Sequence, residues 1–447
     1  MPGPRFTHHQ YGKTEARDPG PRGGNAAKSN IRKGRSAAVP RKILLVVLDG
    51  LGDRPIKDLG NKTPLQAAAT EHLDWFAANG AVGLLDPIAP GVCPGSDTSH
   101  LALLGYDPET TYTGRGPFEA AGVGIDVRPG DVAFRCNFAT VDVGLRVVDR
   151  RAGRIREGTD RLAASLDALT IGDTQVYFRA GTEHRAVLVF RGTGLSPHVS
   201  DTDPHEDRAK VPAAHATQPD GEKTARMLNV FLKRAYEVLA RHEVNRERVG
   251  AGQPPANYVL TRGGGVMPNI PLFPERYGMR GAAVAGVALI KGICRCVGLE
   301  VLPVPGATGG LDSDFAAKAR AATDALATHD FVLVNVKAPD LCGHDGRATE
   351  KAQVLERIDR ELFAHLRAHL PADTVLAVTG DHSTPCARKD HSGDPVPVLV
   401  FGEGLRTDGV GAFDEVAAMH GGLGRLRGRD LLPILLDLAD RSRKYGA

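Results

Sequence analysis

The sequence predicts an α/β protein that has a core with a mainly parallel sheet covered by helices, plus an inserted smaller α/β domain. Near both ends of the chain, short apolar runs alternate with helical segments, which is typical of parallel sheets. Between residues 116 and 261, single apolar and polar residues alternate instead, which is typical of half-buried strands. The composition, 42% hydrophobic and 24% charged over 447 residues, excludes disordered, collagen-like and disulfide-stapled classes.

The core is predicted to begin with a strand at 43–48, a continuous apolar run of the kind that is buried on both faces of a sheet. A helix is predicted to start at Thr63-Pro64-Leu65-Gln66, where a capping threonine precedes proline at the first helical position, and to end near Gly80. A further helix is predicted to start at Ser96. The C-terminal half supplies two more strands and two more helices, with the strands predicted at 331–336 and 374–378 and the helices at 312–328 and 349–369.

The inserted domain is predicted to be more antiparallel than the core. Apolar and polar residues alternate from Val132 to Ala139, residues 141–144 have the composition of a hairpin turn, and further strands are predicted at 175–178 and 185–190. We therefore predict a core formed by residues 41–115 and 262–447 and an inserted, substrate-closing domain formed by residues 116–261. Its hinges are expected near Arg115 and Arg262, in glycine-rich segments.

The formal net charge of +3 is unevenly distributed. Residues 1–42 carry ten Lys or Arg against two acidic residues, whereas the rest of the chain has 46 basic and 51 acidic residues. Residues 1–40 are therefore predicted to be a disordered basic tail, with an organelle transit peptide as the alternative. Because the excess basic charge is not predicted to lie on a folded face, no nucleic-acid partner is expected.

Neither a membrane nor an oxidising compartment is expected. The longest apolar stretch, 281–290, is about half of the ~20 residues that a membrane-spanning helix needs. Six cysteines are too few for a disulfide framework in a chain of this size, so we expect reduced thiols in a cytoplasmic protein.

Three aspartates follow three of the predicted buried strands, and histidines accompany them. Asp340 is followed by His344, and Asp381-His382 by His391, in segments whose prolines and glycines predict loops. Ligands of open α/β sheets bind at the carboxyl ends of strands, and Asp49 ends the first strand. Carboxylates mixed with imidazoles suit Mn²⁺, Zn²⁺ or Co²⁺ better than Ca²⁺, so the pattern predicts a metal site.

Ser96 is a candidate nucleophile because it stands in Pro94-Gly95-Ser96-Asp97-Thr98-Ser99-His100, directly before an apolar helical run. A serine at this place is either the N-cap of that helix or a hydroxyl ionised by a metal, with the helix start helping to hold phosphate. The local sequence leaves both interpretations open.

These segments resemble the archaeal-type 2,3-bisphosphoglycerate-independent phosphoglycerate mutases, members of the alkaline phosphatase superfamily. The resemblance covers residues 41–440. It is carried by the following strings: Leu48-Asp49-Gly50, 94–100, Ala288-Leu289-Ile290-Lys291-Gly292, Val304-Pro305-Gly306-Ala307-Thr308-Gly309-Gly310, 337–346 and Thr379-Gly380-Asp381-His382-Ser383-Thr384-Pro385. It implies an alkaline-phosphatase-like core and an isomerase that interconverts 3-phosphoglycerate and 2-phosphoglycerate in glycolysis and gluconeogenesis.

The resemblance also implies the site. One divalent metal would be held by Asp49, Ser96, Asp381 and His382, and a second by Asp340, His344 and His391. Ser96 would carry the phosphoserine intermediate, and the metals would be Mn²⁺ or alternatively Zn²⁺, Co²⁺ or Mg²⁺, with no 2,3-bisphosphoglycerate needed. The side chains expected to contact phosphoglycerate are Arg262, Lys291, Arg185 and His205.

Several alternatives stay open at this point. His205 or an aspartate of the same loop is expected to act as general acid and base, and the sequence does not choose between them. A metal-dependent phosphatase, or a phosphotransferase acting on another small hydroxy acid, would show the same metal pattern. A metal-stabilised binding protein without turnover is a further alternative, and monomer or homo-oligomer is undecided.

Overall fold

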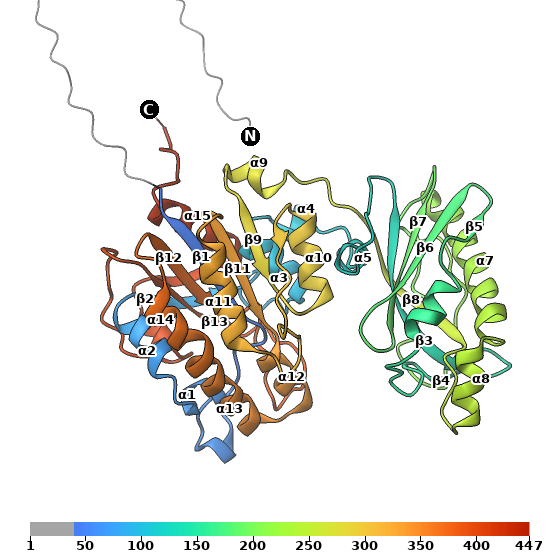
Figure 1. Ribbon diagram of the computed structural model, residues 1–447, viewed down its shortest axis with the longest axis horizontal. Helices are drawn as coiled ribbons and strands as arrows, with labels where there is room; N and C mark the ends of the chain where they lie inside the picture. Colours follow the sequence, from blue (N-terminus) through green and yellow to red (C-terminus); the bar gives the residue numbers. More distant parts are fainter. Residues whose placement is uncertain (1–39, 447) are drawn as a thin grey trace, which may run out of the picture. The chain divides into compact units, whose positions relative to one another are not determined.

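The computed structural model describes residues 40–446, so the predicted tail, apart from Pro40, lies outside the described residues. The larger part is an eight-stranded sheet (Figure 1) in the order β10-β9-β11-β1-β12-β13-β2-β14. Its strands are β10 (Glu300–Val301), β9 (Gly281–Val284), β11 (Phe331–Val336), β1 (Lys42–Leu48), β12 (Thr374–Thr379), β13 (Val396–Phe401), β2 (Ala81–Asp86) and β14 (Gly424–Arg427). Only β13 is antiparallel to its neighbours, so the predicted mainly parallel sheet is confirmed.

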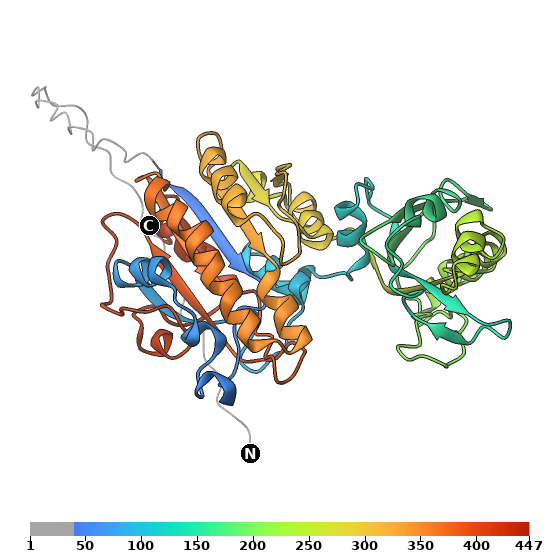
Figure 2. The ribbon, with the colours of Figure 1, turned by 60° about the horizontal axis from the view of Figure 1, so that its bottom comes forward.

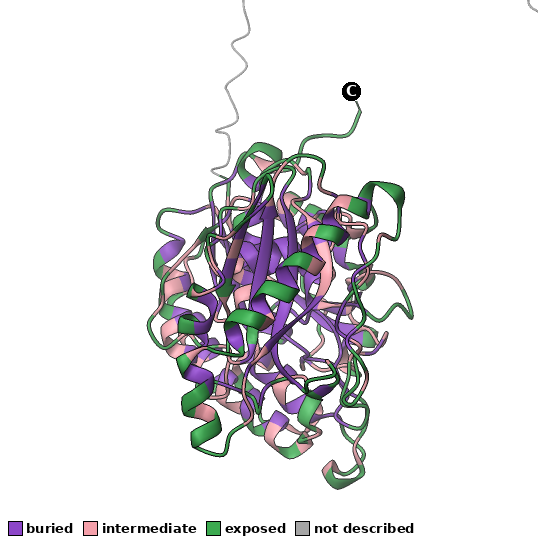
Figure 3. Ribbon diagram, turned by 90° about the vertical axis from the view of Figure 1, so that its right-hand side faces the viewer, coloured by how far each residue is buried: buried purple, intermediate pink, exposed green. Residues whose placement is uncertain are grey.

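Helices cover both faces of this sheet because the central strands β1, β11 and β12 are mainly apolar and are buried on both sides. In β1, Ile43, Leu45 and Val47 belong to one buried cluster, and the alternate residues Leu44, Val46 and Leu48 belong to another. The first cluster includes side chains of α3 (Ser96–Leu103), α10 (Ala288–Cys296) and α15 (Gly428–Leu438). The second includes side chains of α2 (Glu71–Ala78), α11 (Phe315–Ala325), α13 (Ala348–Ile358) and α14 (Ala364–His369). Figure 2 shows the orange helices lying across one face of the sheet, and Figure 3 shows the buried strands beneath helices whose outer sides are exposed.

A second sheet, with its own core, is formed by residues between 132 and 266. Its order is β4-β3-β7-β6-β5, with β8 paired to β3, and all its pairs are antiparallel. The elements are β3 (Val132–Val141), β4 (Val147–Asp149), α6 (Thr159–Ala164), β5 (Thr170–Ile171), β6 (Thr174–Ala180), β7 (Arg185–Arg191), α7 (Glu222–Leu239), α8 (Glu243–Gly250) and β8 (Tyr258–Val266). Phe134, Phe178, Phe190 and Phe231 pack together between this sheet and α7. The α/β fold class with a smaller, more antiparallel part is confirmed.

The remaining short elements connect or flank these two parts. They are η1 (Lys57–Leu59), α1 (Pro64–Ala67), α4 (Pro108–Thr111), α5 (Gly116–Gly122), η2 (Pro219–Gly221), α9 (Phe273–Tyr277), α12 (Ala338–Asp345), η3 (Asp359–Phe363) and η4 (Ala417–His420). Among residues 40–446, no helix combines the length and apolarity needed to cross a membrane.

Four local predictions are wrong in detail. The helix predicted from Thr63 to Gly80 is two helices, because the chain leaves the helical conformation at Ala68 and α2 begins only at Glu71. The helix predicted over 349–369 is interrupted by the π-helical turn η3. Arg262, predicted to lie in a hinge loop, lies within β8 and opposite Arg135 of β3. The fourth is the segment around Asp340, which is helical and is described with the site.

Candidate metal centre

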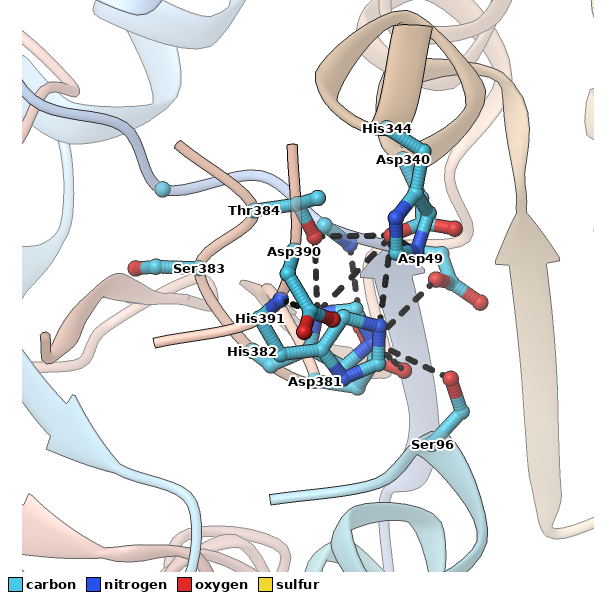
Figure 4. A network of polar contacts seen from close by, with 12 residues as sticks. Asp49, Ser96, Asp340, His344, Asp381, His382, Ser383, Thr384, Asp390 and His391 are labelled. Carbon is cyan, nitrogen blue, oxygen red and sulfur yellow. Dashed lines mark hydrogen bonds and ion pairs between the residues drawn. The ribbon is translucent and has the colours of Figure 1, made fainter. Parts of the chain in front are cut away.

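The carboxyl ends of β11, β1 and β12 meet at one edge of the large sheet. These strands are neighbours and run parallel, with Leu48 opposite Val336 and Val47 opposite Thr379. Asp49 follows β1 directly, and Asp381 follows β12 after Gly380. Figure 4 shows the side chains of Asp49, Asp340, Asp381 and the three histidines pointing toward one another at this edge.

Asp340 and His344 lie on α12, where a loop was predicted. Pro339 falls in the first turn, where a helix needs no donor from the proline nitrogen, and the left-handed Gly346 (φ 73°) ends the helix. Proline and glycine therefore mark the two ends of α12 and do not prevent it. The four-residue spacing puts both side chains on one face, with His344 Nε2 3.4 Å from Asp340 Oδ1.

Asp340, His344 and His391 form the first potential ligand group. His391 Nε2 lies 3.7 Å from Asp340 Oδ1, and one ligand atom from each of the three residues lies within 4.8 Å of the others. His344 Nδ1 contacts the carbonyl of Lys389 at 3.1 Å, and His391 Nδ1 contacts that of Pro94 at 2.8 Å. A carbonyl only accepts, so each Nδ1 carries the proton and each Nε2 lone pair is free to bind a metal.

The second group surrounds His382, which is completely buried. Its Nε2 lies 3.0 Å from Ser96 Oγ, 3.3 Å from Asp381 Oδ2 and 3.6 Å from Asp49 Oδ1. Burial lowers the pKa of His382 to about 3, so the imidazole is neutral, as a metal ligand must be. Contacts of 4.0 Å or less thus join all seven predicted side chains, because His382 Nδ1 also lies 4.0 Å from Asp340 Oδ1.

Ser96 is not the N-cap of its helix, so the first of its two interpretations is excluded. Gly95 holds the capping position, and Ser96 is the first residue of α3. Ser96 is only 6% exposed, and its hydroxyl lies beside His382. Among residues 40–446, no amide of the helix donates a hydrogen bond to this hydroxyl. The structure therefore leaves the hydroxyl free for chemistry.

The charges of the cluster fit divalent cations. Two of the three buried carboxylates pair with one ammonium, since Lys337 Nζ lies 2.8 Å from Asp49 Oδ1 and 2.6 Å from Asp340 Oδ2, and Asp381 is the third. Asp381 Oδ2 is buried and has no hydrogen-bond partner among residues 40–446, an uncommon and costly situation for a carboxylate oxygen. Carboxylate oxygens and imidazole nitrogens in this number suit a transition-metal pair, so the residues present fit the predicted metals.

Burial and neighbouring charges set the protonation of the carboxylates. Burial first, and then the charge of Asp381, raise the pKa of Asp49, which Lys337 opposes. Burial also acts to raise the pKa of Asp340, but Lys337, His382 and His344 together bring it below its ordinary value. The same carboxylates outweigh burial at Lys337 and raise its pKa. Asp340 is therefore a carboxylate in the folded protein.

The predicted substrate contacts lie elsewhere. Among residues 40–446, no hydrogen bond or ion pair joins Arg185, His205, Arg262 or Lys291 to the seven side chains. Lys291 is half-buried on α10. His205 has a left-handed backbone (φ 63°), and its Nε2 lies 3.7 Å from Asp201 Oδ2.

Arg185 belongs to an arginine cluster that the sequence did not predict. Together with Arg115, Arg135 and Glu119 it lines a small cavity. Arg115 Nε donates to Glu119 Oε1 at 2.9 Å. Arg135 Nε is buried 3.8 Å from the same oxygen, and within the described part of the chain it has no hydrogen-bond partner. Burial first, and then the charges of Arg115 and Arg262, lower the pKa of Arg135 to about 9. Three guanidinium groups around one carboxylate leave an excess of positive charge in this cavity.

Arg135 occupies one of the polar positions in the alternating segment 132–139, and that alternation was the only sequence signal for it. Lys337 was also missed as a site residue, although it follows β11 directly. Both became recognisable only once the fold brought them beside other charges.

A mainly parallel α/β sheet whose strand ends gather carboxylates and imidazoles around a serine is typical of metal-dependent phosphoryl-transfer enzymes. Comparison with known proteins is more specific. A family described as 2,3-bisphosphoglycerate-independent phosphoglycerate mutase matches residues 77–245. A phosphoglycerate mutase of this kind from Methanopyrus kandleri is 50% identical over 421 residues, covering 92% of this chain and 100% of the relative. The chain therefore belongs to the family of 2,3-bisphosphoglycerate-independent phosphoglycerate mutases, which are isomerases.

Solved structures agree with this assignment. A protein from Pyrococcus horikoshii is 43% identical, with a TM-score of 0.81 and coverage of 92% of this chain and 100% of that one. The cofactor-independent phosphoglycerate mutase from Thermoplasma acidophilum is 42% identical, with a TM-score of 0.66 and coverage of 89% and 99%.

Proposed function

We propose that this protein interconverts 3-phosphoglycerate and 2-phosphoglycerate, without added 2,3-bisphosphoglycerate, through a phosphoserine at Ser96. The single observation that carries the proposal is the Ser96 hydroxyl, which does not serve as the N-cap of its helix and lies 3.0 Å from His382 Nε2 within the carboxylate and imidazole cluster. Free cysteines, five of the six buried, favour a reducing compartment such as the cytoplasm.

In the proposed centre, Asp49, Ser96, Asp381 and His382 hold one divalent metal. Asp340, His344 and His391 hold the other. When bound, these cations, Mn²⁺ or alternatively Zn²⁺, Co²⁺ or Mg²⁺, supply Lewis-acid stabilisation of phosphoryl oxygens and a lower pKa for the serine hydroxyl. Two observations support cations at this place: three carboxylates are buried together, and among the described residues Asp381 Oδ2 has no hydrogen-bond partner.

Ser96 Oγ attacks the phosphorus in line, so that the bond from Oγ to phosphorus forms while the bond from phosphorus to the 3-oxygen of glycerate breaks. Ser96 loses its hydroxyl proton in this step, and the departing oxygen takes up a proton and becomes a hydroxyl. Glycerate then turns within the site, its 2-hydroxyl loses a proton, and its oxygen attacks the phosphoserine. Ser96 Oγ is the leaving group of this second step, which restores the free serine.

Asp201 and His205 are the proposed proton carriers. They form a pair at 3.7 Å, and Asp201 Oδ1 accepts a hydrogen bond from the Gly263 amide, next to Arg262. The left-handed backbone of His205 is a costly conformation for a residue with a β-carbon, of the kind that persists at functional sites. We assign the pair jointly, with the imidazole relaying the proton.

The arginine cluster holds the anionic ends of phosphoglycerate. Arg185 and Arg262, with Arg115 and Arg135, offer guanidinium forks that match carboxylate and phosphate oxygens. Arg262 is restrained at 3.9 Å from the buried Asp203, which pairs mainly with Arg150 at 2.7 Å. Lys291 is proposed as a further contact from the core.

Residues 116–261 are proposed to close over the site, with one hinge near Arg115 and the other beyond the end of β8 at Val266. A phosphoserine left open to water would be hydrolysed, and the enzyme would then be a phosphatase. Retention of glycerate between the two transfer steps is what makes it a mutase.

The test is a coupled assay with enolase on 3-phosphoglycerate, with no bisphosphoglycerate added and with release of inorganic phosphate measured in parallel. Formation of 2-phosphoglycerate with little phosphate release is expected. Phosphate release without isomerisation would replace the mutase with a hydrolase on the same scaffold.

A further inference from the structure

The three histidines of the candidate centre obtain their orientation in two different ways. His344 and His391 each donate Nδ1–H to a backbone carbonyl, which fixes their tautomer without help from any side chain. Within the described residues, no backbone carbonyl accepts a hydrogen bond from His382. Its Nδ1 lies 3.0 Å from the hydroxyl oxygen of Thr384, a group that can donate or accept.

The direction of this hydrogen bond follows from counting protons. Thr384 Oγ1 donates its only proton to Asp340 Oδ1 at 2.7 Å, because a carboxylate cannot donate in return. The hydroxyl must therefore accept from His382, so Nδ1 carries the imidazole proton. The lone pair of His382 is then on Nε2, the atom that faces Ser96, Asp381 and Asp49.

Thr384 cannot turn away from this position. The residue is fully buried, its amide donates to the Gly52 carbonyl at 3.0 Å, and its carbonyl accepts from Lys351 Nζ at 3.1 Å. Two glycines leave the space that it fills. A β-carbon on Gly50 would lie 2.8 Å from Thr384 Oγ1, and one on Gly343 would lie 2.8 Å from its Cγ2.

We propose that Thr384 is a positioning residue that fixes the Nδ1–H tautomer of His382 and ties the two ligand groups together through Asp340. One hydroxyl thus touches a ligand of each proposed metal, so the two groups cannot reorient independently. This inference rests on the proposed metal centre. It adds that metal affinity depends on a side chain that binds no metal.

The variants that test the proposal are Thr384→Val, which keeps the shape and removes the hydroxyl, and Thr384→Ser, which keeps the hydroxyl. Ser383→Ala is the matched control, because Ser383 is also fully buried but its hydroxyl contacts backbone carbonyls of Asp394 and Pro395 and points away from the cluster (Figure 4). Mn²⁺ binding to metal-free protein is measured by titration calorimetry.

We expect Thr384→Val to weaken Mn²⁺ binding about 10- to 100-fold, the usual effect of losing a partner of a metal ligand. Thr384→Ser and Ser383→Ala should stay within about threefold of the unchanged protein. Equal affinity in Thr384→Val and the unchanged protein would overturn the proposal, and it would do so even if mutase activity had been established.

A second measurement is made on the unchanged protein, so it does not depend on whether the Thr384 variants fold. In metal-free protein labelled with ¹⁵N histidine, the chemical shifts of His382 should report a protonated Nδ1 and an unprotonated Nε2, with His382→Gln identifying the signal. A protonated Nε2 would overturn the proposal. If this tautomer is found in a protein that lacks mutase activity, the proposed function fails and the inference about Thr384 stands.

Discussion

Two lysines of the core are completely buried, and their surroundings predict that the same substitution destabilises the protein at one of them and changes its stability little at the other. Lys351 Nζ donates to Asp53 Oδ2 at 2.9 Å and to the carbonyls of Gly52 and Thr384 at 3.1 Å each, so its charge has a buried carboxylate as partner. Lys318 Nζ donates only to carbonyls, those of Asn335 at 3.0 Å and Thr308 at 3.3 Å. Burial first, and then the charge of Lys291, lower the pKa of Lys318 to about 8.

The magnitudes follow from these contacts. Lys351→Met leaves the Asp53 carboxylate buried without its cation, and breaking such a pair costs about 3–5 kcal/mol. Lys318→Met removes an ammonium whose burial costs on the order of 3 kcal/mol at neutral pH, because its pKa is lowered from 10.5 to about 8 and each unit is worth about 1.4 kcal/mol. The two carbonyls then lose a donor, at about 1–3 kcal/mol in total. We therefore expect Lys318→Met to lie within about 2 kcal/mol of the unchanged protein.

The assay is urea unfolding at pH 7, followed by the fluorescence of the single tryptophan, Trp75, which lies in the same core. The double variant Asp53→Asn/Lys351→Met should recover much of the stability lost in Lys351→Met, since no buried charge then lacks a partner. Equal destabilisation by Lys351→Met and Lys318→Met would refute the reasoning. So would a double variant less stable than Lys351→Met.

Three further predictions address pH, packing and substrate binding. Because the folded pKa of Lys318 is below its ordinary value, this side chain binds more protons in the unfolded chain between about pH 8 and 10.5, so its own contribution to the free energy of unfolding should rise with pH across this window. In urea titrations Lys318→Met should therefore lower the slope of the free energy of unfolding against pH, and an unchanged slope would contradict the assignment. Gly292→Ala should destabilise the protein by about 3 kcal/mol, because the added β-carbon would overlap the backbone of Phe118 on α5. The control Gly250→Ala has open space around it and should be neutral or slightly stabilising. Equal melting temperatures of the two variants would contradict this packing. Arg135→Leu should raise the KM for phosphoglycerate at least tenfold with a smaller change in kcat, and an unchanged KM would remove Arg135 from the anion site.

Much of the fold was predictable because the central core strands are mainly apolar runs. Residues 43–48, 331–336 and 374–378 are buried on both faces, and only a parallel sheet between helices uses such runs. The same logic predicted that residues following these strands would meet at one edge. The helix α12 was missed because Pro339 and Gly346 were interpreted as helix breakers, whereas their positions at its two ends make them helix boundaries.

Other features depend on contacts that no local pattern encodes. Lys318 and Lys351 have the spacing of ordinary helix-face lysines, and only the packing of α11 and α13 against the sheet buries them. Arg135 looked like the exposed half of an alternating strand until other arginines were placed beside it. Thr384 stands directly beside predicted metal ligands in the sequence. The direction of its hydrogen bonds could not be predicted, because it depends on where the fold places Asp340, 44 residues earlier in the chain.

The central claim is that Ser96 carries the phosphoryl group between the two positions of glycerate. The most direct test is mass spectrometry of metal-loaded enzyme mixed with 3-phosphoglycerate and quenched in acid within one turnover. We predict one added phosphoryl group, located on Ser96, and its absence from Ser96→Ala, which should keep its fold and lose mutase activity. A phosphorylated Ser96→Ala protein, or substantial mutase turnover by that variant, would contradict the account.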